Sequence, residues 1–192
     1  TLFRSRLPGE GYNPLTDVQV LSPMHRQECG TENLNKLLQQ ALNPKSPEKP
    51  EFQSSALTFR LGDKVMQTRN NYQKHVFNGD IGFIVQMEPA KVSVKYASDM
   101  IVDYEKSELA DLSLAYALSV HKSQGSEYPV VVLPLTSSHY IMLQRNLLYT
   151  AVTRASQKVI LLGSRAALAT AVGNDRTKRR YTLLAERLAE QL

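Results

Sequence analysis

The spacing of apolar residues predicts a strand and then a helix near the start of the chain. Residues 17–21, DVQVL, are rich in β-branched side chains and predict a strand that ends at Ser22-Pro23. Apolar residues then recur at helical spacing from 34 to 41, and Thr31 is suited to cap this helix. Prolines among polar residues at 44–50 predict an exposed connector, because proline cannot continue a helix.

Between residues 57 and 109 the pattern changes to short alternating strands. Val92, Val94 and Tyr96 alternate with polar residues on one predicted strand, and turn signals such as Asn78-Gly79 separate the strands. Four or five short strands within about fifty residues predict a small β-barrel.

After residue 112 the alternation of strands and helices returns. Strands are predicted at 130–135 and 158–162 with a helix near 141–155 between them, and Ser164 is suited to cap a further helix. Apolar spacing from 181 to 188 predicts a last helix. The fold class is therefore α/β, split by an inserted barrel. The expected domains are residues 1–56 and 112–192 for the α/β part and 57–111 for the insert.

Composition narrows the class of protein. Hydrophobic residues make up 42% of the chain, which is enough for a core, and the single cysteine, Cys29, excludes an internal disulfide. Apolar stretches such as 130–135 fall far short of the roughly 20 residues that span a bilayer. We therefore expect a cytoplasmic protein with no membrane partner. The net charge of +5 favours a polyanionic partner, and the four scattered histidines predict no metal site.

Two segments carry the candidate chemistry. Residues 121–127, HKSQGSE, form a polar turn between apolar runs, where parallel α/β sheets place phosphate and nucleic-acid contacts. In the second segment, RNLLYTAVTRA at 145–155, Leu147 and Ala151 share one helical stripe. The next position on that stripe is Arg154, where a core helix would carry an aliphatic residue. An arginine there predicts a side chain that points into a cleft or at a phosphate.

These segments, with VLSPMHRQECGTENLN at 20–35 and FRLGDKVMQTRNNYQKHVFNGDIG at 59–82, resemble the C-terminal half of the RecD-like superfamily 1B DNA helicases. This family includes the exodeoxyribonuclease V alpha subunit. The resemblance runs in order from about Asp17 to the end of the chain. It implies a second RecA-like domain of the P-loop NTPase type, interrupted by a small SH3-like β-barrel.

The resemblance implies ATP and Mg²⁺ as cofactors of the complete protein. Arg154 matches the arginine that reaches the γ-phosphate in this family, so it is the catalytic candidate, and Arg26 is a second candidate for that contact. Gly125 would let the backbone approach a phosphate or ribose without a Cβ clash, and Glu127 would accept hydrogen bonds from ribose hydroxyls. The segment MHRQEC around Arg26 departs from the glycine-rich version that is usual in the family.

The resemblance also implies contacts with single-stranded DNA. The candidate residues lie at the end of the first strand, in the polar turn and at the barrel edge: Ser22, Pro23, His121, Lys122, Ser123, Gln124, Arg69 and Asn78. Asn78-Gly79 is in the first place a tight-turn signal. Phosphate contacts of this kind give affinity without base preference and weaken as salt rises.

This sequence holds neither the glycine-rich loop that ends in Gly-Lys-Ser/Thr nor an acidic Mg²⁺ motif. We therefore expect the fragment alone to be inactive and to share its ATP cleft with an N-terminal RecA-like domain. The complete protein is expected to be an ATP-dependent helicase or translocase with 5′-to-3′ polarity. Other exodeoxyribonuclease V subunits are further candidate partners.

Two alternatives remain open. One is a stand-alone, non-hydrolysing module that binds single strands or proteins, and the other is the helicase part of a conjugative relaxase. An ATPase assay on this chain does not separate the motor from the module, since both predict no hydrolysis. The sequence encoded upstream of Thr1, the first residue here, does separate them.

Overall fold

The computed structural model describes residues 2–54, 57–136 and 142–175, so the helix predicted at 181–188 lies outside them. The helices are η1 (Leu2–Arg6), α1 (Leu7–Gly9), α2 (Thr31–Leu42), η2 (Ala97–Asp99), η3 (Lys106–Asp111), α3 (Arg145–Val152) and α4 (Arg165–Gly173). Among the described helices, none has the length and apolar character needed to cross a membrane.

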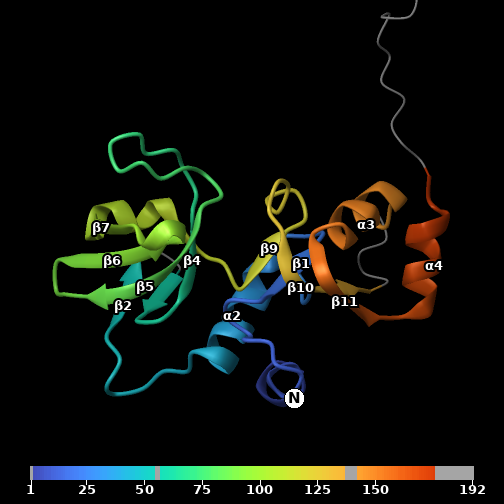
Figure 1. The fold of residues 1–192 in the computed structure, drawn as a ribbon, viewed down its shortest axis with the longest axis horizontal. Helices are drawn as coiled ribbons and strands as arrows, with labels where there is room; N and C mark the ends of the chain where they lie inside the picture. The colour runs from blue at the N-terminus through green and yellow to red at the C-terminus, as the bar shows by residue number, and fades with distance from the viewer. Residues whose placement is uncertain (1, 55–56, 137–141, 176–192) are drawn as a thin grey trace, which may run out of the picture.

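Four strands form a parallel sheet in the order β11-β10-β1-β9, which confirms the predicted α/β class (Figure 1). They are β1 (Val18–Ser22), β9 (Ala117–Ser119), β10 (Tyr128–Leu135) and β11 (Ala155–Gly163). β1 lies between β9 and β10, although β9 precedes β10 by only eight loop residues, 120–127. This loop must therefore cross over β1, and its path decides where the polar turn lies.

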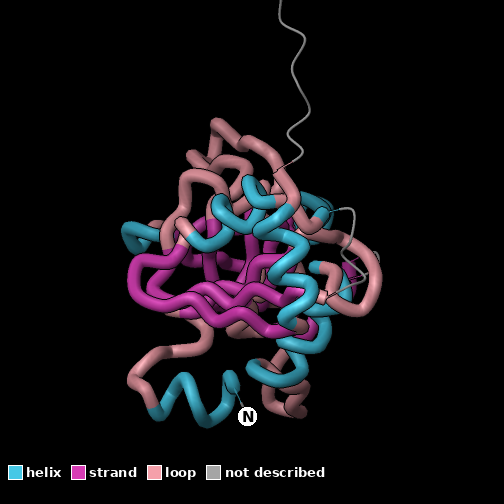
Figure 2. Tube along the Cα trace, turned by 90° about the vertical axis from the view of Figure 1, so that its right-hand side faces the viewer, coloured by secondary structure: helices cyan, strands magenta, loops and turns pink. Residues whose placement is uncertain are grey.

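The pleat of the parallel sheet divides its side chains between two cores. Val130 and Val132 of β10 pack with the N-terminal helical turns and α2, whereas Val131 and Leu133 pack with α3 and α4. In Figure 2 the N-terminal turns lie below the strands, and helices also lie in front of them. Both faces of β10 are thus covered, and burial of each such side chain stabilises the fold by about 1.5–3 kcal/mol.

The insert contains a five-stranded antiparallel sheet in the order β7-β6-β5-β4-β8. Its strands are β4 (Lys64–Gln67), β5 (Ile81–Met87), β6 (Lys91–Tyr96), β7 (Ile101–Glu105) and β8 (Leu112–Leu114). The predicted alternation is confirmed, since Val92, Val94 and Tyr96 are all buried. The predicted barrel closure is not found among the described strands, because β7 and β8 are joined by η3 and do not pair.

The predicted borders of the insert lie inside paired elements. β2 (Glu51–Ser54) precedes residue 57 but pairs with β3 (Leu57–Arg60), and β8 begins at residue 112 but pairs with β4. The connector at 44–50 has no helix or strand, as predicted. The division at residues 56 and 111 itself stays a prediction.

One predicted helix cap is wrong and another is confirmed. The N-cap of α2 is Gly30, and the Thr31 hydroxyl instead lies 3.3 Å from His25 Nδ1. The Thr31 N–H is bound by the Met24 carbonyl at 2.9 Å, so a loop carbonyl replaces the expected side-chain cap. Ser164 does cap α4, where its Oγ accepts from the Ala167 N–H at 3.1 Å.

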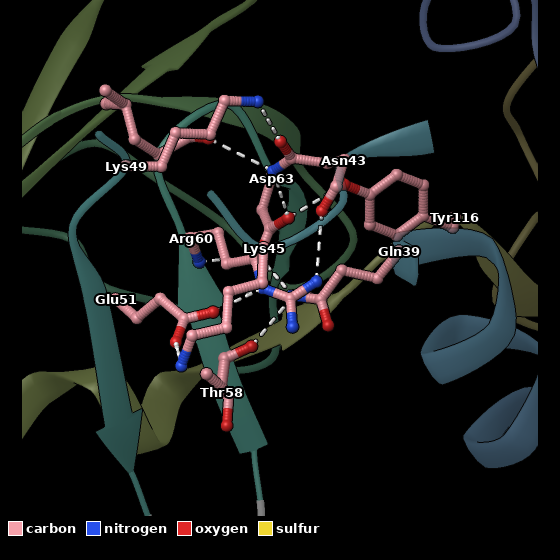
Figure 3. A network of polar contacts seen from close by, with 10 residues as sticks. Gln39, Asn43, Lys45, Lys49, Glu51, Thr58, Arg60, Asp63 and Tyr116 are labelled. Carbon is pink, nitrogen blue, oxygen red and sulfur yellow. Dashed lines mark hydrogen bonds and ion pairs between the residues drawn. The ribbon is translucent and has the colours of Figure 1, made fainter. Parts of the chain in front are cut away.

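A buried carboxylate joins the insert to the α/β domain (Figure 3). Asp63, directly before β4, is fully buried, and each of its two oxygens accepts two hydrogen bonds. Oδ1 accepts from Asn43 Nδ2 at 2.7 Å and from Tyr116 Oη at 2.8 Å. Oδ2 accepts from Gln39 Nε2 at 2.6 Å and from the Arg60 N–H at 2.7 Å. Helix α2, the turn before β4 and the segment before β9 therefore meet at one side chain.

Lys64, the next residue, contacts the parallel sheet directly. Its side chain is 3% exposed, and Nζ donates to the Val18 carbonyl at 3.3 Å. Burial lowers the pKa of Lys64 to about 8, although the charge of Asp17 opposes this shift. Two consecutive residues thus attach the start of β4 to α2 and to β1.

We expect the Asp63→Asn substitution to lower the free energy of unfolding by about 3 kcal/mol, because an amide NH₂ would face two donors that now bind a carboxylate oxygen. Urea unfolding of both forms measures this loss. Asp99→Asn is the matched control, since Asp99 is an exposed carboxylate that pairs with Lys95 at the surface. Equal stability of the Asp63→Asn form and the unmodified chain would contradict the role given to Asp63.

The stability of the chain should rise with pH where Lys64 titrates. Between about pH 8 and the ordinary lysine pKa of 10.5, the unfolded chain keeps a proton that the folded chain has released. The free energy of unfolding is therefore expected to increase by about 2 kcal/mol from pH 8 to 9.5. Urea unfolding across this range tests it, and Lys64→Met should remove the increase. Parallel pH curves for the two forms would rule out the expected titration.

Candidate nucleotide and nucleic-acid site

Two loops leave the carboxyl edge of the parallel sheet next to each other. β1 and β9 end in register, with Ser22 opposite Ser119, and are followed by residues 23–30 and 120–127. Ligands of open α/β sheets bind outside the carboxyl ends of the strands. Most of the predicted DNA contacts, and Arg26, fall in these two loops.

The crossing loop, residues 120–127, is held closely at its start. The Val120 N–H donates to the Ser22 carbonyl at 3.1 Å, and the Ser123 N–H donates to the Ser119 carbonyl at 3.2 Å. Ser123 is fully buried, and its hydroxyl donates to the Val120 carbonyl at 2.7 Å. The Ser123 side chain thus shapes the loop and is not presented to a DNA strand.

His121, Lys122 and Gln124 are exposed in the first half of the polar turn. His121 and Gln124 line a cavity of about 170 Å³ together with Asn146 and Thr150 of α3. The Lys122 side chain instead lines a larger cavity on the other side of the loop. The turn therefore presents polar groups on two sides at the carboxyl edge of the sheet.

Arg154 follows α3 and does not continue it. The helix predicted to residue 155 ends at Val152, and Thr153 and Arg154 form the turn into β11. The helix ends early because Ala155 already pairs with Tyr128 in the sheet. The Arg154 carbonyl accepts the Tyr128 N–H at 2.8 Å, so the arginine lies at the amino end of β10 and β11.

The guanidinium of Arg154 lies against the end of the crossing loop. Nη1 donates to the Ser126 carbonyl at 3.2 Å, and Nε donates to the Thr150 carbonyl at 3.3 Å. Burial raises the pKa of Tyr128, and the charge of Arg154 partly offsets this shift. The side chain is half-buried, so it is positioned by the protein and still reaches the surface.

Gly125 and Glu127 flank the carbonyl that Arg154 contacts, and both are exposed. Gly125 has φ +86°, a left-handed conformation that explains the glycine, and no neighbouring atom lies within 4 Å of a Cβ built there. The predicted reason for a glycine here was close approach of the backbone. No atom of this chain approaches Gly125 in that way, so this reason would require a bound ligand. The structure brings three of the four nucleotide candidates, Arg154, Gly125 and Glu127, to one place.

Arg26 does not join this group. It is exposed on the loop after β1, at the carboxyl edge, whereas Arg154 lies at the amino edge. Six residues of β10, from Tyr128 to the level of Ser22 at Pro134, separate these edges, or about 20 Å at the rise of a strand. Within this chain Arg26 lies with the DNA candidates, and its nucleotide contact stays a prediction.

Ser22 and Pro23 are buried where the first loop begins. The Ser22 hydroxyl donates to the Cys29 carbonyl at 2.6 Å and accepts from the Met24 N–H at 3.2 Å. The loop then returns so tightly that a Cβ on Gly30 would lie 2.2 Å from the Arg26 carbonyl oxygen. The Ser22 hydroxyl thus holds the loop, and the predicted DNA contacts of Ser22 and Pro23 stay predictions.

A cavity of about 400 Å³ lies between α2, the end of β9 and the insert. Its polar lining includes His25, Lys36 and Lys122, and its apolar lining includes Met66 and Leu118. His25 and Lys36 were not among the predicted contacts, because only the packing of α2 beside β9 brings them near Lys122. The helical position of Lys36, one turn after Glu32, was the single available signal.

Arg69 and Asn78 lie on the loop of residues 68–80 in the insert, and both are exposed. Arg69 makes a long ion pair of 3.5 Å with Asp111, and the Asn78 N–H donates to Asn70 Oδ1 at 2.9 Å. This loop follows β4, whose Met66 lines the 400 Å³ cavity. The two predicted insert contacts therefore lie on the loop that follows a cavity-lining strand.

Comparison with known families matches both parts of the chain. Residues 34–104 match the SH3 domain of ATP-dependent RecD-like DNA helicases, and residues 114–162 match the UvrD-like helicase C-terminal domain. The chain is similar to an ATP-dependent RecD2 DNA helicase of Deinococcus radiodurans, with 39% identity over 87% of this chain and 23% of that protein. It is also similar to RecBCD enzyme subunit RecD of Mycolicibacterium smegmatis, with 30% identity over 93% of this chain and 30% of that protein.

Solved structures of Pif1 helicases share the fold. A structure of two coordinating Pif1 helicases at forked double-stranded DNA matches 94% of this chain and 45% of that chain, with 18% identity and a TM-score of 0.58. Bacteroides Pif1 with ADP-AlF3 and single-stranded DNA matches 90% of this chain and 45% of that chain, with 15% identity and a TM-score of 0.58.

The parallel sheet, its inserted SH3 region and these matches define the RecA-like fold of superfamily 1B helicases. The chain belongs to the RecD-like helicases and corresponds to their C-terminal region. It spans about a quarter of the length of the curated relatives that it matches, 23% and 30% in the two cases above.

We expect Gly30→Ala to displace the loop that carries His25 and Arg26, because the new Cβ would overlap the Arg26 carbonyl. Overpacking against backbone should cost about 2–3 kcal/mol of unfolding free energy. Thermal unfolding measures the loss. Gly9→Ala is the control, since nothing lies within 4 Å of its Cβ. Equal melting temperatures for the two variants would contradict this prediction, because the loop would then accept the new Cβ without loss of stability.

Proposed function

We propose that this chain is the second RecA-like domain of an ATP-dependent DNA helicase or translocase, and that it contributes an arginine finger to a shared ATP cleft. The proposal rests on one contact, the hydrogen bond from Arg154 Nη1 to the Ser126 carbonyl. That contact joins the catalytic candidate to the loop that also carries the DNA candidates. Membership of the RecD-like helicases supports the reaction class.

The amino edge of the sheet is the proposed nucleotide end. Arg154 provides a fixed positive charge, the backbone at Gly125 is open to the approach of a ligand, and the exposed Glu127 carboxylate accepts from hydroxyls. These groups suit a triphosphate and its ribose. ATP would supply the phosphoryl group whose transfer to water drives the motor, and an arginine finger in such reactions accelerates transfer by about 10³–10⁵.

The remaining parts of the ATP site would come from outside this sequence. We propose that an upstream RecA-like domain of the same protein holds the phosphates with its glycine-rich loop and holds Mg²⁺ with its acidic motif. In that arrangement Arg154 acts only when the two domains close on the nucleotide. The fragment alone would then bind DNA without hydrolysing ATP.

The carboxyl edge is the proposed DNA end. Lys122, Lys36 and His25 line one cavity there, and His121 and Gln124 lie beside it on the crossing loop. The cavity also has apolar walls and one carboxylate, Glu32. Two lysines that line one cavity suit the phosphates of a single strand, and such contacts read no base sequence. The DNA roles of Arg26 and of the main chain at Ser22 and Pro23 belong to the same proposal.

The crossing loop would couple the two ends. It begins at the DNA end and finishes against Arg154, with its start fixed to Ser22 and Ser119. A change in the contacts of Arg154 during the ATP cycle would therefore pull on the segment that carries His121 and Lys122. Relative movement of the two domains would then step these contacts along the strand.

The Arg154→Ala substitution in the complete protein tests the arginine finger. We expect ATP hydrolysis to fall by about 10³-fold or more, because the transition-state charge loses its partner. Affinity for an oligothymidylate should change little, since the DNA end lies at the other edge of the sheet. Steady-state ATPase assays and fluorescence anisotropy measure the two quantities.

Arg165→Ala is the control for this substitution. Arg165 is an exposed arginine at the start of α4, and it contacts neither the crossing loop nor α3 in any hydrogen bond among the described residues. Its removal should leave hydrolysis unchanged. Full ATPase activity in the Arg154→Ala protein would refute the finger, and a parallel loss of DNA affinity would refute the separation of the two ends.

A further inference from the structure

The loop of residues 68–80 presents two aromatic rings to solvent. Tyr72 is 72% exposed and Phe77 is 43% exposed, and their rings meet edge to face with centroids 5.8 Å apart. Scattered exposed apolar residues are ordinary on protein surfaces. These two contact each other, so they form one aromatic patch on a single loop.

Hydrogen bonds hold the loop on both sides of the two rings. Asn71 and Val76 exchange two backbone hydrogen bonds of 2.7 and 3.1 Å, and Val76 is fully buried. The Phe77 N–H donates to Asp80 Oδ2 at 2.7 Å, and the Lys74 N–H donates to Asn71 Oδ1 at 3.1 Å. These contacts fix the backbone on both sides of the aromatic pair.

Lys74 attaches the loop to the rest of the insert. Its Nζ donates to both carboxylate oxygens of Glu108, at 2.5 and 2.6 Å, and lies 4.9 Å from the centre of the Tyr104 ring. The fold thus secures the loop through Val76 and Lys74 and leaves Tyr72 and Phe77 outside the core. A rigid surface with exposed rings is preorganised for a ligand, because little entropy is lost on binding.

The polar groups around the rings suit a nucleic-acid strand. Residues 68–80 contain one arginine, one lysine and one histidine against one aspartate, Asp80. Lys74 is paired with Glu108, whereas Arg69 is exposed and makes a long ion pair of 3.5 Å with Asp111. Asn70, Gln73 and Asn78 add neutral polar side chains. Exposed aromatic rings beside cations and amides are the means by which proteins hold single strands without base preference: bases stack on the rings while cations contact the phosphates.

The position of the loop also favours a strand. Met66 and Ser113 line the cavity that holds Lys36 and Lys122, and Gln67 and Leu112 are the next pair along β4 and β8. The loop begins at the following residue. In Figure 1 it rises from the upper side of the insert, and the crossing loop after β9 rises from the upper side of the parallel sheet.

We propose that Tyr72 and Phe77 form a stacking platform for a base of single-stranded nucleic acid. This inference rests on the proposed function, because the strand that reaches the platform is the one bound at the carboxyl edge of the sheet. The platform gives the insert a role in binding the strand. It holds one base outside the cavity while Lys36 and Lys122 contact phosphates, which resists sliding in the absence of ATP.

The test uses the 192-residue chain and a fluorescein-labelled oligothymidylate at low salt. Replacing both Tyr72 and Phe77 by Ala should weaken binding about 10- to 100-fold, the range for loss of a stacked base. Tyr72→Phe should keep the affinity and Tyr72→Leu should lose it, because only a ring stacks. A strand carrying 2-aminopurine should be quenched by the unmodified chain and not by the double variant.

Ile101→Ala is the control, since Ile101 is 60% exposed on β7 of the same sheet and lies outside the platform loop. Thermal unfolding confirms that each variant folds. Undiminished affinity of the double variant would overturn the platform and leave the rings as a contact for a protein. If Lys122→Ala weakens binding in that case, the proposed function survives alone. If the unmodified chain binds no oligothymidylate, both proposals fail.

Discussion

The attachment of β4 to the α/β domain is the constraint on which the rest of the structure depends. The chain leaves the parallel sheet after α2 and returns to it only at β9, so both halves must be fixed by tertiary contacts. Asp63 and Lys64 provide these contacts, the first to α2 and the second to β1. Their burial makes the junction specific, because a buried carboxylate and a buried ammonium tolerate few alternative packings.

The crossing loop is the second constraint, and it follows from strand order. Since β1 separates β9 from β10, the residues between them must travel from the carboxyl edge to the amino edge of the sheet. That path fixes one end near Ser22 and the other at Arg154. The two edges of the sheet are therefore connected by eight residues of backbone, 120–127.

The sequence predicted the local structure well and the long-range contacts poorly. Runs such as 130–135 are strands because a buried parallel strand needs continuous apolar residues. Helical periodicity alone placed Arg154 inside a helix, and it gave no sign that pairing of Ala155 with Tyr128 would end that helix at Val152. The predicted barrel closure was wrong for a similar reason. Alternation of apolar and polar residues indicates a strand, but it does not indicate which strands pair.

The same limit explains the missed contacts of the site. His25 and Lys36 approach Lys122 only because α2 packs beside β9, and no spacing in the sequence encodes that distance. β4 connects this packed region to the loop of residues 68–80. Its start is fixed by Asp63 and Lys64, and all of its side chains are buried. Its end leads into the loop that carries Tyr72 and Phe77. The position of Tyr72 and Phe77 relative to the cavity is therefore set at the opposite end of a buried strand, by Asp63 and Lys64.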